Sequence, residues 1–276
     1  MNLTDPIESA EHQFKHILEE FFISVYDKES LSSHGIDHHR RVWCYAKELF
    51  KVFPDQKPGL ITQFPSKLII ACYLHDIGMS VESGVRHGKH SKDLCIKFLA
   101  KNHLNENDYP DVLDAIENHD RKDYQGNSGI NDLLTILSVA DDLDAFGFTG
   151  IFRYSEIYLT RGINLMEIGQ MIQVNAVKRF DNFIKTFGFI DTLVLDHTIR
   201  YEILNDFWSE YNKQIASYQF GGEHPTGYCG IIELIDELIK RKTTLKQMFS
   251  GPYMKSDDPV IRWFINGLIS ESVYFP

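Results

Sequence analysis

His75 and Asp76 stand next to each other at the end of an apolar segment that runs from Leu68 to Leu74. Histidine and aspartate are costly to bury unless a partner satisfies their polar atoms. A divalent metal ion is a sufficient partner, because imidazole nitrogen and carboxylate oxygen are both good ligands for Zn, Mn, Fe or Ni. A hydrogen-bonded His–Asp pair that caps a buried helix explains the dipeptide equally well, so a metal site requires further ligands.

A second candidate ligand comes from the histidine-rich segment 34–42. His34, His38 and His39 are all candidates for this ligand, and His34 is also a candidate for a contact with the substrate. Asp37 in the same segment either orients a histidine by accepting a hydrogen bond from its ring or caps the following helix.

The third contribution comes from a predicted helix at 130–145, which is apolar from Leu133 to Val139 and then carries acidic residues. Asp141 and Asp144 share one face of this helix at three-residue spacing, whereas Asp142 points about 100° away. Three predicted helices therefore bring metal-binding side chains to one place. Together these helices offer enough donors to surround one divalent ion.

Basic side chains near these ligands are candidates for binding an anionic substrate. Arg40 and Arg41 follow His38 closely, and an arginine one turn from a metal either clamps a phosphate oxygen or forms a surface salt bridge. Lys92 allows the same two interpretations. His224 stands in a loop rich in glycine and proline, which either closes over the site or only connects two helices.

Helices must position these residues, because apolar residues recur at three- and four-residue steps along most of the chain. No alternating strand of convincing length is present, so the predicted fold class is all-α. We expect a helical core over residues 1–150 and a helical C-terminal extension over 151–276 that packs on it. The predicted helices cover about 6–25, 38–53, 67–77, 90–102, 110–119, 130–145, 165–187, 196–219, 229–249 and 259–270, with a loop at 78–89.

The order and spacing of these motifs resemble the HD-domain superfamily of metal-dependent phosphohydrolases over residues 30–150. The family pattern is H…HD…D on separate helices, and here it matches His38, His75-Asp76 and Asp141. The resemblance therefore implies that these four residues are the ligands of one divalent ion, with His34 as the second choice in place of His38 and His39 as a further rival. His38-His39-Arg40-Arg41-Val42 is similar to the H-x-x-R-V helix start of the family. The run from Ala140 to Gly147 is similar to its A-D-x-L-D-A-x-G run. The resemblance implies an HD-like helical core with additional C-terminal helices.

Some branches of this superfamily hold a second metal or a phosphate with additional histidines. We expect His90 and His119 to serve in this way, with the Asp76 carboxylate bridging two ions, and His87 is the weaker candidate. Both His90 and His119 are otherwise explained as solvent-facing residues at helix ends. The resemblance therefore implies one or two divalent ions per chain, chosen from Mn, Fe, Ni, Zn or Mg.

The resemblance implies hydrolysis of a nucleotide or another small phosphate ester through a metal-activated water. Asp76 and Asp144 are the candidate proton acceptors, and Arg41, His34 and Lys92 are the candidate substrate contacts. The alarmone-hydrolase branch carries an E-D pair after its HD motif, but Ile77–Ser80 stand at that place here. Two further functions remain open: a di-iron oxygenase with His38, His75, Asp76, His90, His119 and Asp141 as ligands, and a non-catalytic scaffold that senses a nucleotide or binds a partner.

Composition limits the partners of the protein. The formal net charge is −11, which argues against a general nucleic-acid binder but not against a small phosphorylated substrate. No apolar run approaches the roughly 18 residues that span a membrane, and no signal peptide is visible. Four cysteines without a CxxC pair indicate reduced thiols in a cytoplasmic protein. A homo-oligomer remains compatible with the sequence.

Overall fold

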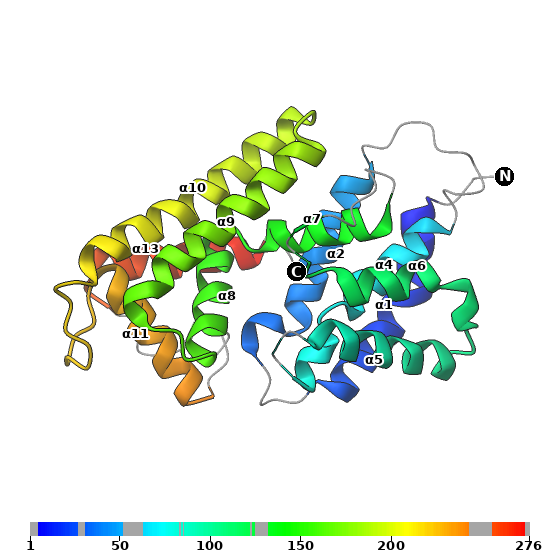
Figure 1. Ribbon diagram of the computed structural model, residues 1–276, viewed down its shortest axis with the longest axis horizontal. Coiled ribbons are helices and arrows are strands. Elements are labelled where there is room, and N and C mark those ends of the chain that lie inside the picture. Colours follow the sequence, from blue (N-terminus) through cyan, green and yellow to red (C-terminus); the bar gives the residue numbers. More distant parts are fainter. Residues whose placement is uncertain are drawn as a thin grey trace. The chain divides into compact units, whose positions relative to one another are not determined.

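The computed structural model describes residues 5–26, 31–51, 63–82, 84, 86–121, 123–124, 132–242 and 256–273. Over these residues the protein consists of α-helices and short 3₁₀ turns without a strand, so the prediction of an all-α fold is confirmed (Figure 1). The 3₁₀ turns are η1 (Ser32–His34), η2 (Ile77–Ser80) and η3 (Glu106–Asp108). The helices are α1 (Pro6–Val25), α2 (Ile36–Lys51), α4 (Phe64–Leu74), α5 (His87–Lys101), α6 (Pro110–Asn118), α7 (Leu133–Asp144), α8 (Gly147–Thr160), α9 (Leu165–Phe187), α10 (Asp191–Gln214), α11 (Gly227–Lys240) and α13 (Pro259–Val273).

Helix boundaries follow local capping chemistry where the sequence provides it. Asp5 accepts the backbone N–H of Ile7 at 2.9 Å and Pro6 occupies the first turn, so α1 begins as predicted. Both α4 and α5 begin three residues before their predicted starts, at Phe64 and His87. Residues 52–53, 130–131 and 243–249 of the predicted helices, and residues 83 and 85 of the predicted loop, lie outside the described residues.

Helix α8 was not predicted from the sequence. Its segment contains two glycines and several β-branched and aromatic residues, all of which have low helix propensity. The helix forms because most of its side chains are buried, and tertiary packing supplies most of the stability of helices in proteins. Propensity alone could not have found this helix.

The described chain divides into two compact units, each made of discontinuous segments. The first contains residues 1–30, 34–143 and 182–190, and the second contains 31–33, 144–181 and 191–276. The predicted division after residue 150 stays a prediction. No helix in the described part of the chain is long and apolar enough to span a membrane.

Helix α4 forms the centre of the first unit. Every side chain from Leu68 to Leu74 is fully buried, because α4 packs against α1, α2 and α6. A helix that is apolar on all sides is normally central in this way. The last turn of α4 therefore delivers His75 and Asp76 into the interior of the unit, where water cannot solvate them.

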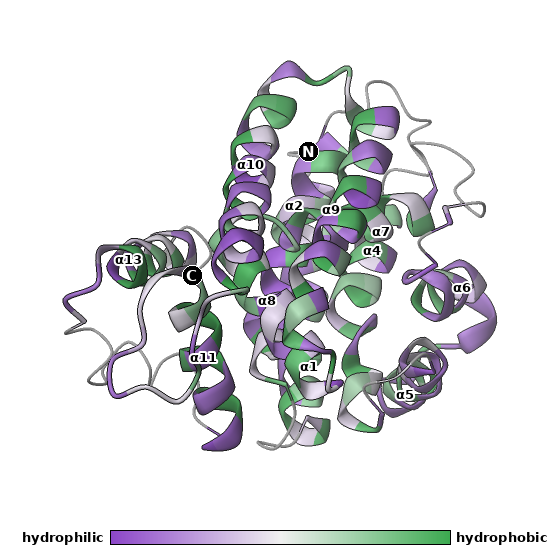
Figure 2. Ribbon diagram, turned by 60° about the vertical axis from the view of Figure 1, so that its left-hand side comes forward, coloured by the Kyte–Doolittle hydropathy of each residue, from purple (hydrophilic) through white to green (hydrophobic). Residues whose placement is uncertain are grey.

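In the second unit, α8 packs against α10, α11 and α13. Helix α11 shows one green, hydrophobic side and one purple, hydrophilic side in Figure 2, and its buried side chains are all apolar or small. The Glu271 carboxylate of α13 accepts the backbone N–H groups of Phe148 at 3.1 Å and Thr149 at 2.7 Å. This carboxylate satisfies two amides at the positive end of α8.

Candidate metal centre

His75 and Asp76 lie where the α4 helix ends. The His75 backbone is still helical, whereas Asp76 leaves the helix at φ −108° and ψ 7°. His75 Nδ1 donates to the carbonyl oxygen of Cys72 at 2.9 Å, since a carbonyl can only accept. In the neutral imidazole the other ring nitrogen, Nε2, therefore carries a lone pair, and it points into the site. This arrangement is the usual way in which a protein fixes the tautomer of a metal-binding histidine.

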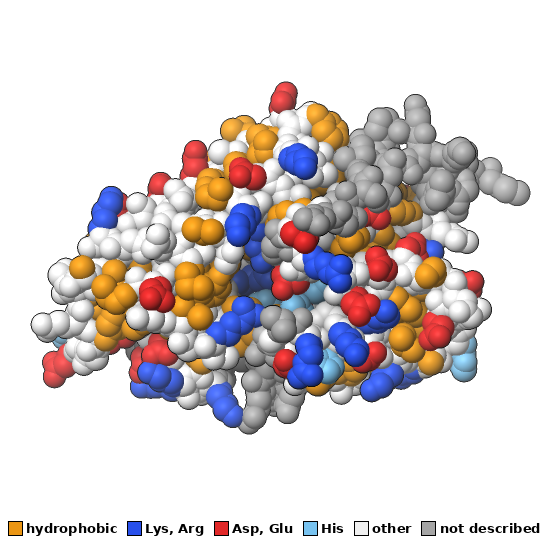
Figure 3. All heavy atoms as spheres, viewed as in Figure 1, with side chains coloured by type: hydrophobic (Ala, Val, Ile, Leu, Met, Phe, Trp, Pro, Cys, Tyr) orange, Lys and Arg blue, Asp and Glu red, His pale blue; other side chains and the backbone are white. Residues whose placement is uncertain are grey.

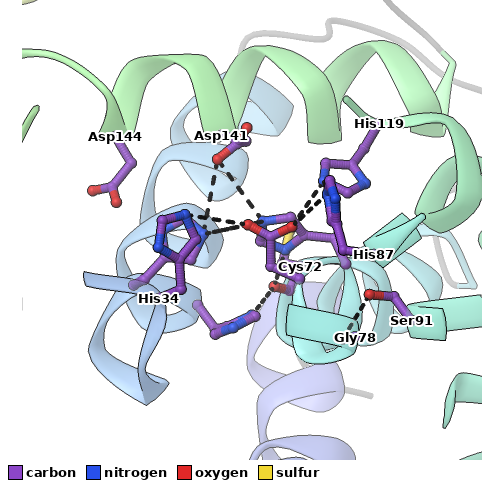
Figure 4. Close-up of polar contacts among 12 residues, drawn as sticks. His34, Cys72, Gly78, His87, Ser91, His119, Asp141 and Asp144 are labelled. Atoms are coloured by element: carbon purple, nitrogen blue, oxygen red, sulfur yellow. Dashed lines mark hydrogen bonds and ion pairs between the residues drawn. The ribbon is translucent and has the colours of Figure 1, made fainter. Parts of the chain in front are cut away.

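The two other helices, α2 and α7, bring their predicted ligands to the same point. His38, in the first turn of α2, places its Nε2 atom 3.1 Å from Nε2 of His75. The same His38 atom lies 3.5 Å from Asp76 Oδ2 and 3.8 Å from Asp141 Oδ1. Asp141 points to this centre from α7 (Figure 4). One ligand atom from each of these four buried residues lies within 4.8 Å of the others.

The donor atoms of this first group fit a divalent cation. Nε2 of neutral His75 is an acceptor, and it faces Asp76 Oδ2 at 3.5 Å and Asp141 Oδ1 at 3.9 Å. Acceptors that face one another in a buried place repel unless a proton or a cation lies between them. Two imidazole nitrogens and two carboxylate oxygens suit Zn, Mn, Fe or Ni better than Mg, which prefers an all-oxygen shell.

A second group of potential ligands shares Asp76 with the first. The Oδ1 atom of Asp76 lies 3.0 Å from Nε2 of His119 and 3.2 Å from Nε2 of His87, and these two nitrogens are 3.4 Å apart. Both histidines donate from Nδ1 to the carbonyl oxygen three residues earlier, at 2.8 Å in each case. Each oxygen of Asp76 therefore faces a separate group, and the carboxylate is placed to bridge two ions.

The electrostatics of the site reflect this concentration of imidazoles around Asp76. Burial acts to raise the pKa of the Asp76 carboxyl, but His75 and the hydrogen bonds from the surrounding histidines hold that pKa well below its usual value. For His87, burial acts to lower the pKa, and the bond to Asp76 outweighs it and raises the pKa to about 9. The chain thus keeps Asp76 ionised, which is the state that binds a cation.

The two rivals of His38 lie outside the first group. His39 is fully buried, donates from Nδ1 to the Cys72 carbonyl oxygen at 3.2 Å, and packs on the ring of Phe22 with centroids 4.6 Å apart. Burial is the main cause that lowers the pKa of His39 well below its usual value. His34 is buried at the end of η1, with Nε2 3.8 Å from Asp76 Oδ2. It lies beside the ligands and is placed for a contact with a bound molecule.

His90 and Lys92 point away from both groups. His90 Nε2 faces Glu82 Oε2 at 3.4 Å, and Lys92 Nζ forms an ion pair with Glu117 Oε2 at 2.6 Å. The structure therefore brings His87, and not His90, to the second group beside His119 (Figure 4). The adjacent Gly88 is the one signal in the sequence that could have favoured His87, because a glycine permits close packing of the helix start.

The remaining predicted residues have other surroundings. Asp144 is fully buried and accepts a hydrogen bond from the Arg153 guanidinium at 3.1 Å, within the second unit. Arg40 bonds both oxygens of Glu19, at 3.0 and 2.8 Å, and it also bonds Asp37 at 3.0 Å. Arg40 and Asp37 therefore form a salt bridge with each other.

Two further predicted residues differ in their exposure. Arg41 is half-buried on α2 in the first unit. His224 is exposed within the second unit.

Comparison with known proteins agrees with this geometry. Residues 35–145 match the family model of the HD domain, and this segment contains all the members of both ligand groups. No curated protein and no solved structure matches the chain. The chain therefore contains an HD domain, the domain of the HD superfamily of metal-dependent phosphohydrolases.

Proposed function

We propose that this protein is a phosphohydrolase that uses two divalent ions to hydrolyse a small phosphate ester, with a nucleotide as the leading substrate class. The observation that carries the proposal is the shared carboxylate of Asp76, whose two oxygens face two separate groups of imidazoles. Two ions a few ångströms apart are a recurring arrangement in phosphatases and nucleases. The HD domain assigned above supports the same class of reaction.

Different residues around this centre would have different roles. His38, His75 and Asp141 would hold the first ion, His87 and His119 would hold the second, and Asp76 would bridge both. When bound, divalent ions lower the pKa of a coordinated water and neutralise charge on phosphoryl oxygens. His34, buried beside Asp76, would contact a phosphate oxygen or exchange a proton, because imidazole titrates near neutral pH.

A small substrate fits the charge of the protein better than a nucleic acid does. The chain carries a net charge of −11, and acidic and basic side chains are intermixed on the face shown in Figure 3. Nucleic-acid binders usually present a continuous basic surface. The bound ions would supply the positive charge that a small phosphate ester requires.

The proposal is tested by loading the metal-free chain with Mn²⁺, Fe²⁺, Ni²⁺ or Zn²⁺ and measuring phosphate release. The panel should contain a phosphomonoester, a phosphodiester, and nucleoside mono-, di- and triphosphates. We expect turnover that depends on metal and is lost in Asp76→Ala. Turnover by metal-free protein, or full activity in Asp76→Ala, would contradict the proposal.

A di-iron oxygenase is the second candidate, and the composition of the two groups favours it over a non-catalytic scaffold, which needs no metal ligands. The ligands include four histidines and two aspartates, and nitrogen with oxygen donors also suits redox-active iron. Consumption of dioxygen by the iron-loaded chain, in the absence of phosphate release from the panel, would replace the hydrolase with this candidate.

A further inference from the structure

The three residues of the second group come from three different segments. Two glycines and one serine make close packing contacts between these segments. Asp76 precedes η2, His87 is the first residue of α5, and His119 follows α6. The α5 start contacts η2 on one side and the end of α6 on the other. The position of His87 between Asp76 and His119 therefore depends on how closely these backbones approach.

The contact between η2 and α5 is made by Gly78 and Ser91. The backbone N–H of Gly78 donates to Ser91 Oγ at 2.8 Å, and both residues are buried. A Cβ atom on Gly78 would lie only 2.2 Å from the carbonyl oxygen of His87. Only glycine fits here, and the serine hydroxyl satisfies an amide that would otherwise be buried without an acceptor.

The contact between α5 and α6 depends on Gly88. A Cβ atom on Gly88 would lie 2.6 Å from the carbonyl oxygen of Glu117, two residues before His119. Each of the three ligands thus stands within two residues of one of these contacts. The first group shares only Asp76 with these contacts, because His38 and Asp141 lie on α2 and α7 and His75 directly follows α4.

We propose that Ser91, Gly78 and Gly88 are positioning residues for the second ion, and that they set its affinity without affecting the first. The inference rests on the two-ion centre of the proposed function. Loss of the Ser91 hydroxyl would leave the Gly78 amide unsatisfied and would let α5 move relative to η2. Partners that act behind the ligands typically change metal affinity by about 10- to 100-fold, so we expect at least a tenfold loss at the second ion.

The experiment uses the full chain and Mn²⁺ alone, with Ser91→Ala as the main variant. Equilibrium dialysis gives the number and affinity of bound ions, and electron paramagnetic resonance distinguishes a coupled Mn²⁺ pair from a single ion. We expect the first affinity to stay within about twofold, and the second to fall at least tenfold with loss of the coupled signal. Ser91→Thr keeps the acceptor oxygen and should restore the pair. Ser80→Ala is the control, because Ser80 Oγ donates to the carbonyl oxygen of Ile77 within its own turn, at 2.7 Å.

Gly88→Ala provides an independent test, since it should separate His87 from His119 by adding a methyl group against Glu117. Gly222→Ala is the matched control, because no described atom lies within 4 Å of the added carbon. Equal weakening of both ions in Ser91→Ala, or no change in either, would overturn the inference while the two-ion centre stands. Binding of a single ion by the unaltered chain would overturn both.

Discussion

Because Asp76 belongs to both groups, its substitution should weaken the binding of both ions. Substitution of any other proposed ligand should weaken only one. Asp76→Asn keeps the size of the side chain but removes its charge. The first group would then retain one carboxylate, Asp141, and the second group would retain none. Asp141→Asn, the matched variant, removes one carboxylate from the first group and leaves the second group intact.

The expected magnitudes follow from these contacts. Altering a group behind a metal ligand typically costs about 10- to 100-fold in affinity. Neutralising a direct ligand in a buried site should cost more, so we expect a loss above about 100-fold, or roughly 2.7 kcal/mol per ion. Asp76→Asn should show this loss for both ions, and Asp141→Asn should show it only for the first. Because both changes are isosteric, neither should create a cavity.

Equilibrium dialysis against Mn²⁺, followed by elemental analysis of the protein, measures both affinities directly. Far-UV circular dichroism of the same samples should show unchanged helix content in both variants. If Asp76→Asn retains one ion with the affinity of the unaltered chain, then its carboxylate is not shared. If the two variants lose the same single ion, the assignment of two groups is wrong.

Three other predictions follow from the described contacts. His38→Phe should abolish binding of the first ion. His39→Phe should retain it at near-normal affinity, because His39 Nδ1 donates to the Cys72 carbonyl oxygen and His39 is not a member of the ligand group; equal loss in both would contradict the assignment of His38. His197 is kept neutral by burial and by Arg200, which lower its pKa from 6.5 to about 3, so the unfolded chain takes up a proton first as pH falls below 6.5. The contribution of neutral His197 to the free energy of unfolding is therefore present above pH 6.5 and is lost towards pH 3, at up to about 1.4 kcal/mol per pH unit. Urea unfolding at a series of pH values should show that the free energy of unfolding falls less steeply in His197→Phe. Glu271→Ala should lower the free energy of unfolding by about 1 kcal/mol, because two amides at the start of α8 lose their acceptor, and urea unfolding at neutral pH should show this loss; no change would mean that water replaces it.

The helical pattern of the chain could be predicted because it depends on local periodicity. Apolar residues at three- and four-residue steps indicated α1, α2, α4 and α7 within a few residues of their observed positions. The exception is α8, whose composition gives it low helix propensity, and only its burial among the helices of the second unit makes it a helix.

The grouping of the four residues of the first group could also be predicted, since a polar residue in an apolar helix must find a partner inside. His75, Asp76 and Asp141 are buried for the reason that the pattern suggested, and the structure gathers them around His38. The pattern left the choice between His38, His34 and His39 open, because all three stand close together on one short segment. Only the packing of α2 against α4 decides that a nitrogen of His38 faces Nε2 of His75, since the rings of His38 and His39 both lie 5.0 Å from the His75 ring.

The amino-acid pattern alone indicates that helices carry histidines and aspartates into an apolar interior, because apolar runs and helical spacing are properties of neighbouring residues. Tertiary packing is what brings His87 to His119 and Asp76, while His90 turns to Glu82. His87 and His90 are three residues apart on one helix, so spacing cannot distinguish them. The difference arises from how closely α5 approaches its neighbours, and that distance is set by backbones far apart in the sequence.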